Sequence, residues 1–375
     1  MKKLLPIILF TTLLWGCRNG GNDGYHDAGA EAGDTLTLHS NLLTMVRLPD
    51  GNIETTIANP WGNGNLQRLI LVPADSALPE AQQGVEIIRV PVEHAGVFSS
   101  VHTGGLKELG AIDAIAGVAD AAYFSQNDTI RTLVNEGKIA DLGVSTAPSV
   151  ERIAVAGIDV ILRSPMEGTA AGALPPSVVP VEMADYMETS PIGRAEWLLL
   201  LGALTNQLPR AQAILDSVVN CYSDLHLKAS LAQTPSPKVL TETEQSGVWY
   251  VPGTKSYMAR FITDAGGTLP WTDEGVTGSV PMSAEAVAAA ALDADVWLIR
   301  SYGTMVDAKA LKAMNPRHAA FKAVKDNNVW CANTAQVPLF DDIAFHPERL
   351  LADYIAIFHP DALPDHRMNY FTNQR

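Results

Sequence analysis

The stretch "SSVHTGGLKELGAID" at residues 99–113 places two polar side chains at a junction between a strand and a helix. A predicted strand ends just before it, and we expect a helix to begin at about Thr103, next to His102. In α/β proteins, ligands bind at the carboxyl ends of strands, where such junctions lie. His102 and Thr103 are therefore candidate ligand-binding residues.

Patterns typical of catalysis or phosphate binding are missing from this junction. Ser99 and Ser100 lack the G-x-S-x-G nucleophile elbow, and the glycines fit neither a P-loop nor G-x-G-x-x-G. No H-E-x-x-H motif occurs, and the nine histidines are scattered, without pairs at metal-ligand spacing. We expect no catalytic residues, no resident metal and no cofactor, and we predict that the protein is not an enzyme.

Further candidate ligand-binding residues follow predicted strands elsewhere in the chain. The segment "GVWYVPGTKSYM" (247–258) has the same order of strand, polar turn and helix as residues 96–106. Aromatic side chains at such positions suit a large planar or macrocyclic ligand, and a carboxylate suits a cationic part of it. These candidates are Trp249, Tyr250, Tyr302 and Asp341, with Pro165, Met166 and Glu167 as weaker ones.

Two segments far apart in the chain resemble each other. "SVERIAVAGIDVILRS" (149–164) and "SAEAVAAAALDADVWLIRS" (283–301) each contain a serine-capped helix, Asp-Val, an apolar strand and a final Arg-Ser. A serine caps free N–H groups, and an early glutamate suits the positive end of a helix. Together with the match between 96–106 and 247–258, this similarity predicts two similar lobes.

A long helix is predicted between the two lobes. Apolar residues recur at helical spacing from 211 to 225, and Pro209 suits the first turn of a helix. The expected helix 209–231 would be about 34 Å long. We therefore predict an α/β fold of two Rossmann-like lobes joined by a single long α-helix. The expected boundaries are 34–205 for the N-terminal lobe, 206–235 for the linker helix and 236–375 for the C-terminal lobe.

The N-terminus has the features of an exported protein. Residues 1–16 combine a basic start with an apolar run that is too short to span a bilayer, which is typical of a secretory signal. Gly16-Cys17 resembles the bacterial lipoprotein box, and this resemblance implies that Cys17 is lipidated. Residues 17–33 are rich in Gly, Asn, Asp and Ala and are expected to form a flexible tether.

Net charge excludes some partners. The chain has 41 acidic residues against 26 Lys and Arg, a formal net charge of −15. Phosphates would be repelled, so nucleic acid is not an expected partner. Cys221 and Cys331 are expected to be thiols, although a disulfide between them stays possible.

At the level of family, the chain resembles an ABC-transporter substrate-binding protein of the iron-complex or cobalamin type, from a Bacteroides-like lipoprotein branch. The resemblance is strongest in "SSVHTGGLKELGAIDAIAGV", "DYMETSPIGRAEW", "GTKSYMARFITDAGG" and "ADYIAIFHPDALPDH". It implies a monomer in the periplasm, anchored to the membrane by lipid. The implied ligand is an iron complex (siderophore or haem) or cobalamin, held in a largely preformed cleft, and the implied partner is a permease in the inner membrane.

Two other functions stay open from the residues alone. A zinc- or manganese-binding protein of the same two-lobe class would need about three histidines and a carboxylate from both lobes. A lipid-anchored enzyme on the same scaffold would need a catalytic pair or a cofactor. Purified protein with or without a coloured iron- or cobalt-containing ligand would distinguish these possibilities.

Overall fold

The computed structural model describes residues 33–124, 128–168, 174–273 and 275–373. Cys17, the predicted signal peptide and the predicted tether up to residue 32 lie outside these described residues. Residues 33–375 group together as one unit. Within the described ranges, no helix is both long enough and apolar enough to cross a membrane.

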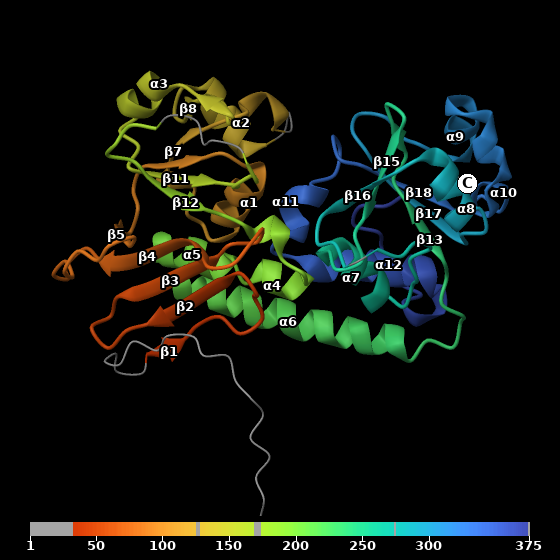
Figure 1. Ribbon diagram of the computed structural model, residues 1–375, viewed down its shortest axis with the longest axis horizontal. Helices are drawn as coiled ribbons and strands as arrows, with labels where there is room; N and C mark the ends of the chain where they lie inside the picture. Colours follow the sequence, from red (N-terminus) through yellow and green to blue (C-terminus); the bar gives the residue numbers. More distant parts are fainter. Residues whose placement is uncertain (1–32, 125–127, 169–173, 274, 374–375) are drawn as a thin grey trace, which may run out of the picture. The chain divides into compact units, whose positions relative to one another are not determined.

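Two five-stranded sheets form the first half of the described chain (Figure 1). One has the order β1-β2-β3-β4-β5; neighbours are antiparallel except β4 and β5, which run parallel. The other has the order β12-β11-β6-β7-β8 and is parallel throughout. A short antiparallel pair, β9 and β10, lies outside both sheets. The strands are β1 (Asp34–Thr35), β2 (Leu43–Arg47), β3 (Ile53–Ala58), β4 (Asn65–Pro73), β5 (Glu86–Val90), β6 (Ala95–Val97), β7 (Ile115–Val118), β8 (Ala140–Asp141), β9 (Gly143–Val144), β10 (Ala147–Pro148), β11 (Val160–Arg163) and β12 (Val179–Glu182).

The central strands of the parallel sheet are apolar along their length. Residues 95–97 of β6 and 160–162 of β11 are all buried. Strands in a parallel sheet are covered on both faces, so a continuous apolar run is expected there. The helices of this half are α1 (Ser100–Glu108), α2 (Thr129–Asn135), α3 (Val150–Val155), α4 (Pro191–Ala195) and α5 (Leu198–Leu204), with 3₁₀ turns η1 (Ile112–Ala114), η2 (Ala121–Tyr123) and η3 (Asp185–Met187).

One long helix, α6 (Leu208–Ser230), leads from the first half into the second (Figure 1). It confirms the predicted linker helix, with ends that differ by one residue from those expected. Its apolar side contributes to two separate clusters of buried side chains. Leu208, Ala211, Leu215 and Val218 pack with the first half, and Tyr222, Leu225 and Ala229 pack with the second.

The second half holds two smaller sheets. A parallel sheet has the order β13-β17-β18, and an antiparallel sheet has the order β14-β15-β16. The strands are β13 (Val239–Thr241), β14 (Glu244–Gln245), β15 (Val248–Pro252), β16 (Ser279–Met282), β17 (Val296–Ser301) and β18 (Val329–Asn333). The helices are α7 (Tyr257–Asp264), α8 (Ala284–Ala291), α9 (Ala308–Met314), α10 (Lys322–Lys325), α11 (Leu339–Ile343) and α12 (Pro347–Phe358), with 3₁₀ turns η4 (Pro316–Ala320) and η5 (Pro360–Ala362).

The repeated segment occupies matching places in the two parallel sheets. The Ser149 and Ser283 side chains cap α3 and α8 by accepting from the backbone N–H three residues on. The strands that follow, β11 and β17, each lie inside their sheet with a parallel neighbour on both sides. The predicted α/β fold of two lobes joined by one helix is confirmed, while the exact lobe boundaries stay a prediction.

The other predicted correspondence is wrong. β6 belongs to a parallel sheet, whereas β15 pairs with β14 and β16 in the antiparallel sheet. Residues 248–252 therefore do not end at the same sheet edge as β13 and β17. A strand followed by a polar turn and a helix occurs in both kinds of sheet, so the local pattern alone does not distinguish them.

Candidate functional site

An interior strand of each parallel sheet has, at or next to its carboxyl end, an arginine that is paired with a carboxylate. Arg163, the last residue of β11, donates its Nε to Glu182 Oε1 at 2.9 Å, and the two residues are register partners on adjacent strands. Arg300, near the end of β17, is paired with Glu242, which follows β13. All four side chains are largely buried but keep some exposure. Each lobe thus presents an arginine–carboxylate pair at the carboxyl end of its parallel sheet.

An aromatic ring lies beside the arginine of the second pair. The Arg300 guanidinium carbon lies 5.6 Å from the centre of the Phe340 ring, and that residue is 43% exposed. Tyr302, two residues after Arg300, is 71% exposed. Burial works against the charge on Arg300, but the Glu242 carboxylate outweighs it, so the pKa of the guanidinium is raised. Arg300 is therefore a permanent cation beside accessible aromatic surface.

Asp341 lies where α11 packs against α1. Its Oδ1 accepts a hydrogen bond from the Ser100 hydroxyl at 2.6 Å. Burial raises the pKa of the Asp341 carboxyl, because the Ser100 bond and the charge of Lys107 compensate for the lost water only in part. Asp341 thus connects the start of α1 to the second half of the chain.

His102 and Thr103 are buried within the protein. His102 Nε2 lies 3.1 Å from Asp185 Oδ1, and Arg194 Nε donates to Asp185 Oδ2 at 2.9 Å. The Thr103 hydroxyl donates to the Ser100 carbonyl oxygen at 2.8 Å. His102 is 0% exposed, so it offers no surface to a ligand in this conformation. The helix also begins earlier than expected, at Ser100 rather than Thr103.

Trp249 is a core residue of the second half, which corrects the expectation that it lines a cleft. It is 1% exposed, and its ring stacks on Trp297 with the centres 5.6 Å apart. Its indole N–H donates to the Thr241 carbonyl oxygen at 2.8 Å. Trp249 does not line a cleft because β15 lies in the antiparallel sheet, where the Trp249 side chain points into the core of the lobe.

The remaining predicted residues lie at the surface, in different places. Tyr250 is 49% exposed on β15. Glu167 is exposed and lies in the segment that follows β11. Tyr302 follows Arg300 by two residues in the chain, and Phe340, next to Asp341, is the ring over Arg300. His102 and Trp249 lie in the interior, and a role of the other predicted residues in binding stays a prediction.

Sequence reasoning did not select the two arginine–carboxylate pairs as binding residues. The shared Arg-Ser at 163–164 and 300–301 was visible as part of the repeat and could have indicated them. Glu182 and Glu242 carry no such signal, because each belongs to a segment that becomes a neighbour only in the sheet. Among the described residues, no group of three or more His, Cys, Asp or Glu side chains could hold a metal ion.

The fold and these strand ends define an α/β binding protein with two lobes joined by one long helix. The sequence profile of the family described as periplasmic binding protein matches residues 98–332, and the chain belongs to this family. An uncharacterized lipoprotein of Methanocaldococcus jannaschii is 26% identical in an alignment of 409 residues that covers 99% of this chain and 96% of that protein.

Solved structures share the fold. A periplasmic heme-binding protein from Pseudomonas aeruginosa is 18% identical with a TM-score of 0.58, covering 76% of this chain and 98% of that chain. A periplasmic binding protein from Veillonella parvula is 18% identical with a TM-score of 0.57, covering 72% of this chain and 91% of that chain. The family-level resemblance found in the sequence is confirmed, and the Bacteroides-like lipoprotein branch stays a prediction.

Proposed function

We propose that this protein is the substrate-binding component of an ABC importer, and that it captures an iron complex (siderophore or haem) or cobalamin at the carboxyl ends of the parallel strands of its lobes. The observation that carries the proposal is the matched arginine at the end of β11 and near the end of β17, with the accessible Phe340 ring beside Arg300. Carboxyl ends of strands in α/β sheets are the usual place for a ligand.

The chemistry of these residues suits a large anionic chelate. A guanidinium has five N–H donors in a planar fork, and one carboxylate uses only part of them. Arg163 and Arg300 therefore keep donors for ligand oxygens while their carboxylate partners hold them in place. Tyr302 and Phe340 supply flat apolar surface on which a conjugated ring can stack.

The proposed location is the periplasm, with the protein anchored to a membrane through lipid on Cys17, where it would meet its permease. The family to which the chain belongs and the lipoprotein of Methanocaldococcus jannaschii support this location. A tether that ends in lipid would keep the lobes close to the permease while leaving them free to bind.

Mass spectrometry and metal analysis of the purified full chain test the ligand. We expect a bound iron or cobalt chelate, or saturable binding when ferric siderophore, hemin and cyanocobalamin are each titrated into the protein. Saturable binding of Zn²⁺ or Mn²⁺ instead, with none of the three chelates bound, would contradict the proposal and favour an elemental-metal binder.

Tyr302→Ala tests the position of the site. We expect the affinity for the bound chelate to fall by about 1–2 kcal/mol, roughly 5- to 30-fold, because a stacked ring is lost. Tyr250→Ala is the matched control, since this exposed tyrosine lies on the antiparallel sheet. Unchanged binding by the Tyr302 variant, or an equal loss in both variants, would place the ligand elsewhere.

A further inference from the structure

A pocket lies against the linker helix, away from the strand ends described above. It has a volume of about 430 Å³ and is lined by residues from α1, α6 and the start of α12. It therefore borders the first half, the linker helix and the second half of the chain. Its polar and charged lining residues are Glu108, Arg210, Ser217, Cys221, His346, Glu348 and Arg349.

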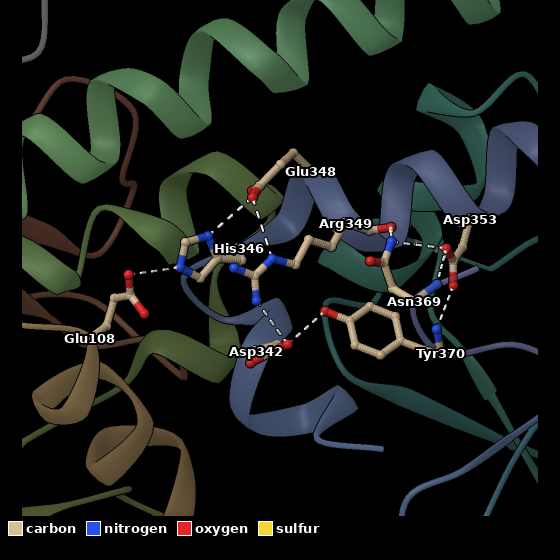
Figure 2. Close-up of polar contacts among 8 residues, drawn as sticks. All are labelled: Glu108, Asp342, His346, Glu348, Arg349, Asp353, Asn369 and Tyr370. Atoms are coloured by element: carbon tan, nitrogen blue, oxygen red, sulfur yellow. Dashed lines mark hydrogen bonds and ion pairs between the residues drawn. The ribbon is translucent and has the colours of Figure 1, made fainter. Parts of the chain in front are cut away.

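His346 stands between two carboxylates in this pocket (Figure 2). Its Nδ1 lies 3.0 Å from Glu348 Oε1, on the second residue of α12, and its Nε2 lies 3.6 Å from Glu108 Oε1, at the end of α1. His346 Nε2 and Glu348 Oε2 are buried and have no hydrogen-bond partner within the described residues. The imidazole thus faces one carboxylate of its own lobe and one of the other lobe.

The protonation state of His346 determines whether its contact with Glu108 is attractive or repulsive. A neutral imidazole carries one proton, and the close contact with Glu348 places it on Nδ1. Nε2 then presents a lone pair toward the Glu108 carboxylate, and the two repel each other. An imidazolium carries a proton on each nitrogen, so Nε2–H points at Glu108 and both contacts become charge-assisted. The attraction across the lobes therefore exists only in the protonated form.

The other charged groups around His346 do not disrupt its contact with Glu108. Arg349 lies 3.0 Å from Asp342 and 3.9 Å from Glu348, so its charge is shared between two carboxylates. Burial raises the pKa of the Cys221 thiol, which keeps it neutral. The titratable and charged groups that face His346 are Glu108 on α1, Arg210 and Cys221 on α6, Asp342 on α11, and Glu348 and Arg349 on α12.

We propose that His346 is a proton-operated tie between the lobes: protonated, it bridges Glu348 and Glu108, and deprotonated, it releases Glu108. The pocket gives the ring a route for exchanging protons with solvent. Histidine is the side chain whose charge ordinarily changes between pH 5 and 8, and this determines the two pH values of the test below. The inference does not depend on which ligand the strand ends bind.

A double-mutant cycle on the full chain tests the tie. Urea unfolding is measured for the parent, Glu108→Gln, His346→Gln and the double variant, at pH 5.5 and at pH 8.5. We expect the pair to be coupled at pH 5.5 by up to about fivefold in the unfolding equilibrium constant, and the coupling to vanish or reverse at pH 8.5. Glutamine keeps the size and polarity of both side chains, so all four proteins are expected to fold.

Lys107 and Asp128 provide the control. Their side chains lie 2.9 Å apart within the first half, and neither is a histidine, the side chain whose charge ordinarily changes between pH 5 and 8. The cycle of Lys107→Gln and Asp128→Asn should give the same coupling at both pH values. The proposal would be overturned by a His346–Glu108 coupling that is absent at pH 5.5, or equal at the two pH values, or by a control cycle that changes as much.

Discussion

At the scale of single residues, the clearest feature is the buried group around Asp185. Its carboxylate contacts His102 and Arg194, and the Arg194 guanidinium carbon lies 4.7 Å from the centre of the Tyr257 ring on α7. Buried charges are tolerated when each is paired and hydrogen-bonded. His102 therefore contributes to the buried polar group around Asp185. This contact explains why a histidine at the start of a helix is not exposed to ligand.

Asp185→Asn tests this role. Burial alone would raise the pKa of Asp185, but Arg194 and His102 outweigh it, so the pKa is lowered in the folded state. The stabilisation is thus fully present above the unfolded value of about 4 and is lost as the pH falls through the lower folded value. Because Arg194 would be left buried without its partner, we expect a loss of about 3–5 kcal/mol in urea unfolding at pH 7.

Asp293→Asn is the comparison for that measurement. Asp293 is paired with Lys238 at the surface, and such pairs contribute little. The Asp185 variant should also lose the part of the acid dependence below about pH 4 that comes from Asp185. Similar stabilities for the two variants at pH 7 would contradict a structural role for the buried group.

At the scale of elements, the junction of α1 with α5 and α11 depends on two glycines. A Cβ on Gly105 would lie 2.6 Å from Leu201 Cδ1 and 2.6 Å from Phe345 Cε2. A Cβ on Gly104 would lie 3.1 Å from the Asp341 carbonyl oxygen. Side chains and a backbone carbonyl of the protein itself thus lie against the middle of this helix. The glycines of "HTGG" permit close packing there.

Gly105→Ala is expected to destabilise the protein. Alanine favours a helix by about 1 kcal/mol over glycine, but the new methyl group would overlap two side chains. Overpacking of this kind costs about 1–3 kcal/mol, so we expect a lower melting temperature. Gly104→Ala is the matched variant on the same helix and should cost less, because its tightest contact is longer. A more stable Gly105 variant would show that α1 is not packed as described.

At the scale of the whole molecule, the two halves are connected by more than the linker helix. Ala344 and Phe345, from the second half, belong to the same buried cluster as Leu106 and Leu201 of the first. A helix that packs in both cores and a shared apolar contact both resist bending. We therefore expect only small hinge movement on ligand binding and a largely preformed site.

Cys17→Ser tests how the whole molecule is held at the membrane. The proposed lipidation would require the Cys17 thiol, so the variant should lose incorporation of labelled fatty acid and appear in the soluble fraction after cell lysis. Cys221→Ser is the matched control, because this second thiol lies on α6. Labelled lipid on the Cys17 variant would place the anchor at another residue.

The sequence by itself determined the local elements and their order. Helical spacing between 211 and 225 located α6 to within one residue, and the serine caps with the shared Arg-Ser endings located β11 and β17 in matching places. These features follow from periodicity and capping, which act between residues a few positions apart. The fold class and the family resemblance rest on such local patterns.

Only the tertiary structure decided which side chains meet. The assignment of β15 to an antiparallel sheet places Trp249 in the core, and Asp185, 83 residues after His102, is the partner that keeps this histidine inside. Glu182 and Glu242 reach their arginines through neighbouring strands of a sheet. Strand pairing and burial are set by the packing of distant segments. The same local pattern, a strand followed by a polar turn and a helix, occurs in parallel and in antiparallel sheets. Its side chains can lie either in the core or at a ligand-binding site.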